Sequence, residues 1–255
     1  MDFTVSLADS ETGKLDNRKN VTGGVSNGLI HWTDVRVGNG ATLDVDADKQ
    51  ADVQLDLTLM GSLATLDADS HREAGRDSQI LFGDLATTVQ DTTFVIDINR
   101  RDGSSASGTF VGSVSPGASP GTLTLDPING SDEVVFASTF HYDWELGITA
   151  DLIEVLGDLT VADGVSIQLT TLAGATSGTY DLFTYTGAFT GDLDTWNVSN
   201  PDGQISYDLI WDTGSSIQLL NAVVSTVPEP TALVLMGLAM TLLLLSRPPR
   251  HRTAI

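Results

Sequence analysis

The sequence predicts an all-β protein, and three observations support this fold class. Residues 51–59 alternate strictly between apolar and polar side chains, which is the period of a half-buried β-strand. Other segments rich in β-branched and aromatic residues are separated by short stretches that contain Gly, Asn or Asp. Before residue 227, no segment shows the apolar period of an amphipathic helix. We therefore expect strands and tight turns up to about residue 226.

Each expected strand follows from its own residues. In Ala51–Leu59, the alternation puts the apolar side chains on one face, which should be buried. The other strand candidates are Thr93–Ile98, Gly121–Leu125, Val134–Trp144, Tyr180–Tyr185 and Ser216–Leu220. Turns are expected at Gly38–Gly40, Asn129–Gly130, Asp163–Gly164 and Asp202–Gly203.

Two segments, Val35–Val45 and Leu159–Leu169, align without a gap. Each has apolar residues at its positions 1, 3, 9 and 11 and a glycine at position 6, which is Gly40 or Gly164. A strand, a turn and a second strand in this order are typical both of a β-hairpin and of one corner of a β-solenoid. We favour a parallel β-solenoid, and a two-sheet β-sandwich is the alternative because such units suit both folds.

A further pattern lies between Ser115 and Gly191. Ser115–Leu125 carries two Ser-Pro-Gly triplets before a Thr-Leu-Thr-Leu strand, and Asp151–Val161 and Gly178–Gly187 have the form of successive coils. This region resembles exported β-helical proteins with autotransporter-associated β-strand repeats. The resemblance implies a right-handed parallel β-helix, of the kind used as a passenger or surface-layer module, and it transfers no catalytic residues.

Charge and cysteine content exclude several classes of protein. The chain has 34 acidic and 12 basic residues, a formal net charge of −22 and no cysteine. Nucleic-acid binding requires a basic surface, and a surface this acidic repels nucleic acid. We therefore expect no nucleic-acid partner. Without cysteine there are neither disulfides nor thiol chemistry.

The chain is expected to comprise three regions. Residues 1–110 and 111–226 are β-rich, and residues 227–255 form a C-terminal segment of different composition. From Thr231 to Ser246 there is no charge, and a helix of that length rises about 24 Å, somewhat less than the roughly 30 Å hydrocarbon core of a bilayer. We expect a transmembrane helix over 231–246. A buried C-terminal helix is less suitable, because the segment is apolar on all sides and ends in basic residues.

Basic residues orient this helix. Arg247, Arg250 and Arg252 follow the apolar segment, whereas no Lys or Arg occurs between Asp102 and Ser246. The positive-inside rule therefore places the C-terminus in the cytoplasm and the large N-terminal part outside.

The motif Val227-Pro228-Glu229-Pro230 directly precedes the apolar segment. Motif, apolar segment and arginine cluster together resemble the PEP-CTERM sorting signal of bacterial exosortase substrates. The resemblance implies that these four residues are the sorting and processing motif, read by an exosortase-type membrane protease or transpeptidase. It also implies a single-pass form in the cell envelope, held in membrane lipid through 231–246, and then a cell-surface or extracellular product.

Export requires an N-terminal signal peptide. Residues 1–25 contain neither its basic start nor its apolar core. We therefore expect that the natural start lies upstream and that the region 1–110 is truncated.

Two groups of side chains are candidate metal ligands. Asp44, Asp46 and Asp48 resemble the start of a calcium loop, but the glycine and glutamate of an EF-hand do not follow at the sixth and twelfth positions. They form either a looser Ca²⁺ site that includes Asp52 or a solvated acidic stretch.

The second group is His141, Asp143 and Glu145, which alternate with aromatic residues and so share one face of a strand. A histidine with two carboxylates is suited to a transition metal. Alternatively, this is the solvent face of a strand that buries Phe140, Tyr142 and Trp144 on its other side.

Three functions remain at this point. The leading hypothesis is a non-catalytic protein of the cell surface or extracellular matrix, with extracellular polysaccharide as a partner and no required cofactor. The alternatives are a polysaccharide-acting enzyme on a β-helix, which needs paired acids or a basic residue, and a Ca²⁺-dependent carbohydrate-binding module.

Overall fold

The computed structural model describes residues 4–16, 28–46, 51–70, 72–73, 76–77, 79–100, 107–117, 120–128 and 133–225. The chain divides into two compact units, residues 1–224 and 225–255. Only Ser225 of the described residues belongs to the second unit, so the fold described below is that of the first.

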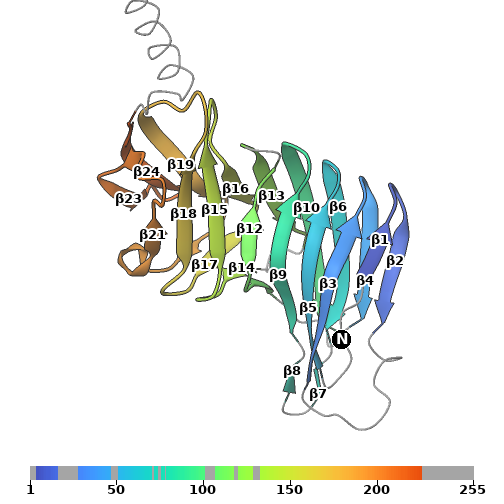
Figure 1. The fold of residues 1–255 in the computed structure, drawn as a ribbon. Coiled ribbons are helices and arrows are strands. Elements are labelled where there is room, and N and C mark those ends of the chain that lie inside the picture. Colours follow the sequence, from blue (N-terminus) through green and yellow to red (C-terminus); the bar gives the residue numbers. More distant parts are fainter. Residues whose placement is uncertain are drawn as a thin grey trace, which may run out of the picture. The chain divides into compact units, whose positions relative to one another are not determined.

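The first unit is a β-solenoid of about six turns, and each turn contributes to two parallel sheets (Figure 1). We call the sheet that begins with β1 (Thr4–Leu7) sheet A and the sheet that begins with β2 (Thr12–Asp16) sheet B. Sheet A continues through β3 (Gly28–Val37), β5 (Ala51–Leu59), β9 (Ile80–Thr87), β11 (Gly108–Phe110), β12 (Ser113–Ser115), β14 (Glu133–Phe136), β15 (His141–Leu146), β17 (Asp158–Val161), β18 (Ser166–Thr171), β20 (Phe189–Thr190) and β21 (Asn197–Ser199). Sheet B continues through β4 (Ala41–Asp46), β6 (Leu63–Ser70), β10 (Asp91–Arg100), β13 (Thr122–Pro127), β16 (Leu152–Val155) and β19 (Gly178–Tyr185).

Coils stack in register, but their lengths differ. Leu43 pairs with Leu66, 23 residues further on, whereas Thr92 pairs with Leu123, 31 residues further on. Every second side chain of a strand points inward, so β15 buries Tyr142, Trp144 and Leu146 and leaves the residues between them half-exposed. The two inward faces meet in one continuous apolar core.

Aromatic rings form a ladder through the middle of this core. Phe82, Phe110 and Phe136 occupy paired positions on successive coils. The rings of Phe82 and Phe110 stack with centroids 4.5 Å apart, and those of Phe136 and Phe140 stack at 4.1 Å. Parallel register places like residues above one another, so one aromatic position per coil is enough to build the ladder.

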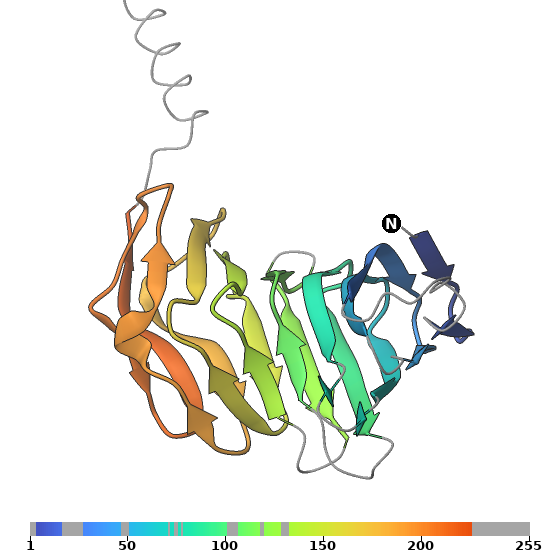
Figure 2. The ribbon, with the colours of Figure 1, turned by 90° about the horizontal axis from the view of Figure 1, so that it is seen from below.

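The C-terminal end of the solenoid is closed by antiparallel strands (Figure 2). β24 (Ser216–Val224) pairs antiparallel with β19, and β22 (Ile205–Ser206) and β23 (Leu209–Asp212) pair antiparallel with β24. A separate short hairpin, β7 (Arg72–Glu73) and β8 (Arg76–Asp77), projects between β6 and β9.

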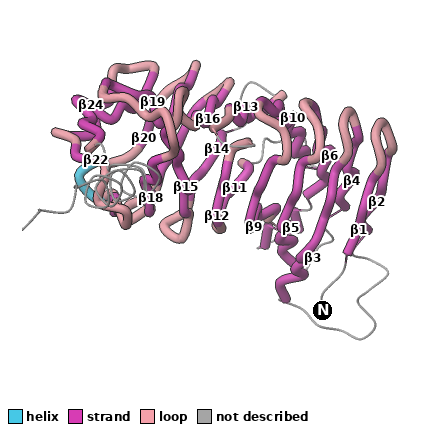
Figure 3. Tube along the Cα trace, turned by 45° about the horizontal axis from the view of Figure 1, so that its top comes forward, coloured by secondary structure: helices cyan, strands magenta, loops and turns pink. Residues whose placement is uncertain are grey.

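The structure confirms the all-β prediction and the solenoid (Figure 3). Within the described ranges, the one helical element is the 3₁₀ turn η2 (Leu193–Thr195). The strand expected at Ala51–Leu59 has those bounds, and Val53, Leu55, Leu57 and Leu59 are buried. The segment Val134–Trp144 is instead split into β14 and β15, because a turn at 137–140 interrupts the alternation. The boundary expected after residue 110 falls between β11 and β12, within one coil.

The two similar segments are corners rather than hairpins. Val35–Val45 turns from sheet A into sheet B, with Gly40 at φ 68°, whereas Leu159–Leu169 turns within sheet A, with Gly164 at φ 83°. Both glycines occupy the left-handed region that other residues rarely adopt. The same local pattern therefore serves two different corners of the coil.

Candidate functional site

Several predicted site residues lie outside the described part of the chain. These are the sorting motif Val227, Pro228, Glu229 and Pro230, the arginines Arg247, Arg250 and Arg252, and Asp48. The expected membrane segment 231–246 also lies there. In the ranges that the structure describes, no helix is both long and apolar enough to cross a bilayer.

Asp44 lies on β4 and joins an acidic row across sheet B. Its carboxylate forms an ion pair with Lys14 on β2 at 3.0 Å, and its strand neighbours are Asp67 on β6 and then Asp97 on β10. Burial raises the pKa of Asp67, and the charges of Asp97, Asp44 and Asp69 raise it further, while Lys14 lowers it. Asp46 pairs with Asp69 in the next coil. The acids therefore align between coils rather than along one loop.

The second candidate group lies on the half-exposed face of β15. The Nε2 atom of His141 is 3.0 Å from Oδ1 of Asp143, and the backbone N–H of Glu145 donates to Asp151. Phe140, Tyr142 and Trp144 are buried, so the strand is amphipathic as expected. Among the described residues, no three His, Asp or Glu side chains are placed to hold a metal ion.

Aspartate carboxylates repeatedly bind the backbone of a neighbouring coil. Each such carboxylate accepts an N–H at a turn, at a bulge or at the end of a strand, where the regular ladder of a parallel sheet is interrupted. The pairs are Asp9 with Asn39, Asp52 with Gln79, Asp56 with Asp84, Asp84 with Ser113, Asp158 with Ala188 and Asp202 with Thr171, at 2.7–3.2 Å between oxygen and nitrogen. These acids therefore act as acceptors that join coils.

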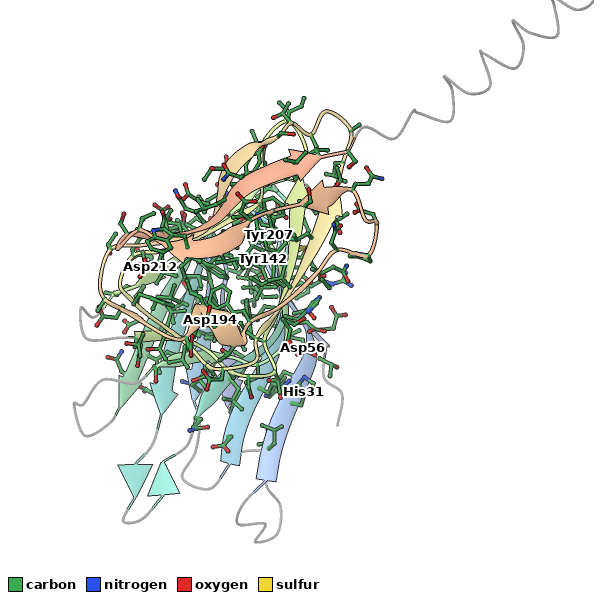
Figure 4. All side chains as sticks on the ribbon, turned by 90° about the vertical axis from the view of Figure 1, so that its left-hand side faces the viewer. His31, Asp56, Tyr142, Asp194, Tyr207 and Asp212 are labelled. Carbon is green, nitrogen blue, oxygen red and sulfur yellow. The ribbon has the colours of Figure 1, made fainter. Side chains whose placement is uncertain are left out.

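A series of hydrogen bonds that involve aspartates crosses four coils of sheet A. Nε2 of His31 lies 2.8 Å from Oδ2 of Asp56, and Oδ1 of Asp56 accepts the N–H of Asp84 at 3.2 Å. Asp84 in turn accepts the N–H of Ser113 at 2.8 Å. The register between β5 and β9 shifts at Asp56, so the line follows a bulge. Figure 4 shows His31 beside Asp56 on the outer side of the sheet.

Asp151 is a buried carboxylate with the same role. Its Oδ1 accepts the N–H of Gly121 at 2.7 Å and its Oδ2 that of Glu145 at 3.0 Å. Burial raises the pKa of Asp151 to about 7, although both N–H bonds act to lower it. Near it, the hydroxyl of Tyr142 is buried without a hydrogen-bond partner in the described part of the chain, and its pKa is raised by burial and by the charge of Asp151.

A groove of about 630 Å³ opens at the C-terminal end of the solenoid, which Figure 4 views end-on. It is lined by residues within 192–198 and 207–212, and we call it the C-terminal groove. One wall comes from η2 and β21 at the end of sheet A, and the other from β23 and the residues before it. Its volume lies in the range of about 300–1,000 Å³ typical of small-molecule sites.

Three aromatic residues line the C-terminal groove. Trp196 is the buried one, at 8% exposure, and packs edge-on against Phe183 with centroids 5.7 Å apart. Its indole N–H is enclosed and has no hydrogen-bond partner among the described residues. Tyr207 is half-buried, and burial raises its pKa. Trp211 is 56% exposed. The groove is thus lined by one buried and one exposed tryptophan and by a half-buried tyrosine.

Carboxylates border the same groove on both walls. Asp194 lies on one wall and Asp212 on the other (Figure 4). Asp212 is fixed in place, because Tyr185 Oη and the N–H of Gly214 both donate to its Oδ1. Burial and the bond to Asp212 raise the pKa of Tyr185. Asp192 caps η2 by accepting the N–H of Asp194 at 3.1 Å.

Sequence reasoning did not find this groove. Its residues come from η2, β21, β23 and the turn before β23, and no spacing in the sequence links them. The one available signal is a tryptophan, Trp211, placed between an apolar residue and an aspartate just before the Thr213-Gly214 turn.

Comparison with known proteins adds no assignment to this geometry. The chain matches no family model, no curated protein and no solved structure at a significant level.

Proposed function

We propose that this chain is a non-catalytic protein of the bacterial cell surface or extracellular matrix, exported and sorted through its C-terminal segment. In this proposal the solenoid winds right-handed, 231–246 forms a transmembrane helix, and an exosortase-type enzyme processes the chain at Val227–Pro230. The C-terminus faces the cytoplasm until processing. The mature product is a rigid acidic rod segment displayed outside the cell.

One observation carries the non-catalytic part of the proposal, namely the use of aspartates as joints between coils. Asp56, Asp84 and Asp151 each accept backbone N–H groups of a neighbouring coil. Catalytic acids of glycoside hydrolases occur as a pair that flanks the bond to be cleaved, and these acids are instead distributed along the stack. Such acceptors stabilise a stack of coils, and this structural use of the acids supports the proposal of a non-catalytic protein.

One short segment of the chain has the residue pattern of a hydrolase nucleophile motif. Residues 24–28 read Gly-Val-Ser-Asn-Gly, which matches the Gly-x-Ser-x-Gly of a nucleophile elbow. In that motif a helix follows the serine, whereas here the strand β3 begins at Gly28. The pattern therefore lacks the helix that follows the nucleophilic serine in such hydrolases.

Intact-mass analysis of the exported full chain tests the proposal. In a host with an active exosortase, the mature protein should lack the residues that follow Val227–Pro230, and in a host without that enzyme it should keep them. Replacing Pro228, Glu229 and Pro230 by alanine should preserve the tail in both hosts. Replacing Pro248 and Pro249 by alanine is the matched control and should leave processing unchanged. Retention of residues 232–255 in the active host would count against sorting.

The enzyme alternative has its own experiment. The full chain is incubated with acidic and neutral polysaccharides, and reducing ends and unsaturated products are followed over time. No release above a heat-treated control is expected. Release that is lost on replacing one aspartate pair would establish catalysis and end the proposal.

A further inference from the structure

Trp211 differs from the other tryptophans of the chain in its exposure. Trp32, Trp144 and Trp196 are buried at 6%, 0% and 8% exposure, whereas Trp211 is 56% exposed. Its backbone is held in β23, opposite Gln218 of β24, so the ring is presented from a paired strand. Tryptophan is enriched at binding surfaces, because its large ring contributes apolar contact area while its N–H can donate a hydrogen bond.

The floor of the C-terminal groove supplies a second, independent observation. Trp196 is more than nine-tenths buried, lines the groove, and has an indole N–H without a partner among the described residues. The indole nitrogen itself is enclosed, so Trp196 gives the groove an aromatic floor and not a free hydrogen-bond donor. Tyr207 adds a hydroxyl to the same lining.

The carboxylates determine which ligand fits. Asp192, Asp194 and Asp212 border the groove, and no lysine or arginine occurs between Asp102 and Ser246. A carboxylate accepts charge-assisted hydrogen bonds from hydroxyl groups and repels other anions. A ligand therefore needs several hydroxyl donors, an apolar face for an indole ring, and no negative charge.

We propose that the C-terminal groove binds a neutral oligosaccharide. The apolar face of a pyranose ring stacks on Trp211, and hydroxyl groups donate to Asp194 and Asp212 on the two walls. Trp196 and Tyr207 contact the ligand from the floor. This site is independent of sorting and processing, so it stands or falls separately from the proposed function.

An apolar peptide or a second copy of the chain fits less well. Covering the groove with an apolar surface would take the carboxylates of Asp192, Asp194 and Asp212 out of water without donors for their second oxygens and for Asp194, which is costly. Sugar hydroxyls satisfy those carboxylates while the ring covers the indole. The carboxylates thus favour the saccharide over the other two occupants.

Fluorescence titration tests the proposal on the full-length chain, held in a zwitterionic detergent without a sugar headgroup. Cellohexaose and chitohexaose are the neutral probes, and hexagalacturonate is the anionic probe. The emission of Trp211 is isolated as the difference between the wild type and Trp211→Phe. It should begin as that of a water-exposed indole and shift to shorter wavelength with at least one neutral probe, and it should stay unchanged with the anionic probe.

Calorimetry with the same probes gives the affinity. Trp211→Ala should weaken binding of the neutral probe by about tenfold or more, as removal of a central aromatic contact usually does. Ile148→Ala is the matched control, because Ile148 is 86% exposed outside the groove, and it should bind as the wild type does. Asp194→Asn should weaken binding of the neutral probe without altering the fold.

Three results would overturn this inference. The first is no binding of either neutral probe, and the second is unchanged affinity in Trp211→Ala. The third is a Trp211 emission that is already that of a buried indole before sugar is added. A concentration-dependent emission of that kind would identify a second copy as the occupant, and a concentration-independent one would identify a segment of the same chain.

Discussion

The carboxylate of Asp151 accepts the backbone N–H of Gly121 at 2.7 Å, across 30 residues of sequence and from one coil to the preceding one. Its second oxygen accepts the N–H of Glu145, so one buried side chain joins two coils of the solenoid. Burial raises the pKa of this carboxyl to about 7. The contact therefore changes its charge state near neutral pH.

The first prediction concerns pH. The pKa of Asp151 is higher in the folded protein than in the unfolded chain, so the folded state keeps this proton up to a higher pH. The stability that this protonated carboxyl contributes is therefore lost as the pH rises from about 4 to about 7. Between pH 5 and pH 8 this loss should be about 2–3 kcal/mol, given 1.36 kcal/mol per pKa unit. Urea unfolding of wild type and Asp151→Asn at several pH values measures it.

The comparison isolates Asp151 because all other titrating groups are common to both proteins. At pH 5 the variant should be the less stable, because the amide nitrogen cannot accept an N–H, whereas the hydroxyl oxygen of the protonated carboxyl still carries a lone pair. Toward pH 8 the difference should shrink or reverse. Stability curves that stay parallel across this range would show that the carboxyl does not titrate there.

The second prediction concerns the exposed joints. Asp84→Ala removes the acceptor of the Ser113 N–H and should cost about 1 kcal/mol, because water can partly replace the exposed carboxylate. The loss should be local, so hydrogen exchange at Ser113 should accelerate by about fivefold. Asp126→Ala is the control, since Asp126 also faces outward and its carboxylate forms no hydrogen bond with the described residues. Equal losses of stability in Asp84→Ala and Asp126→Ala would show that the Asp84 carboxylate does not hold the two coils together.

The third prediction concerns the closeness of two coils. A Cβ on Gly121 would lie 2.1 Å from the carbonyl oxygen of Gln90, so Gly121→Ala must push backbone away from backbone. We expect a loss of about 3 kcal/mol in unfolding free energy. At Gly164 nothing lies within 4 Å, and alanine there should cost only the strain of a positive φ, about 1–2 kcal/mol. Denaturant unfolding should rank the two in this order.

The fourth prediction concerns the aromatic ladder. Phe136 is fully buried and contacts the rings of Phe110, Phe140 and Phe183, so Phe136→Ala should cost about 3–5 kcal/mol. Phe189→Ala should cost less, because Phe189 is half-buried at the end of sheet A. Circular dichroism in urea can measure both variants. A smaller loss for Phe136→Ala than for Phe189→Ala would contradict a central ladder.

Much of the fold could be read from local patterns. Strand Ala51–Leu59 was predicted with its bounds and its buried face, because alternation is a property of consecutive residues. The turns at Gly40 and Gly164 were predicted because a positive φ favours glycine. Val134–Trp144 was predicted as one strand, since all its residues suit a strand and only the corner at 137–140 interrupts it.

The candidate site was not readable in this way. Asp44 lies opposite Asp67 on the neighbouring strand, and Asp67 lies opposite Asp97 on the strand after that, although the sequence suggested Asp46 and Asp48 as the partners of Asp44. Those distant partners depend on register, and register depends on coil length, which varies from 23 residues at Leu43 to 31 at Thr92. Without a constant period, no motif marks which residues will stack.

The sequence by itself determined the strands, their buried faces, the glycine corners and the acidic character of the surface, because each is encoded within a few consecutive residues. The tertiary structure decided which aspartates join which coils and that Trp196, Tyr207 and Trp211 line one groove. Those contacts link residues that only the stacking of coils and the antiparallel closure by β24 bring together.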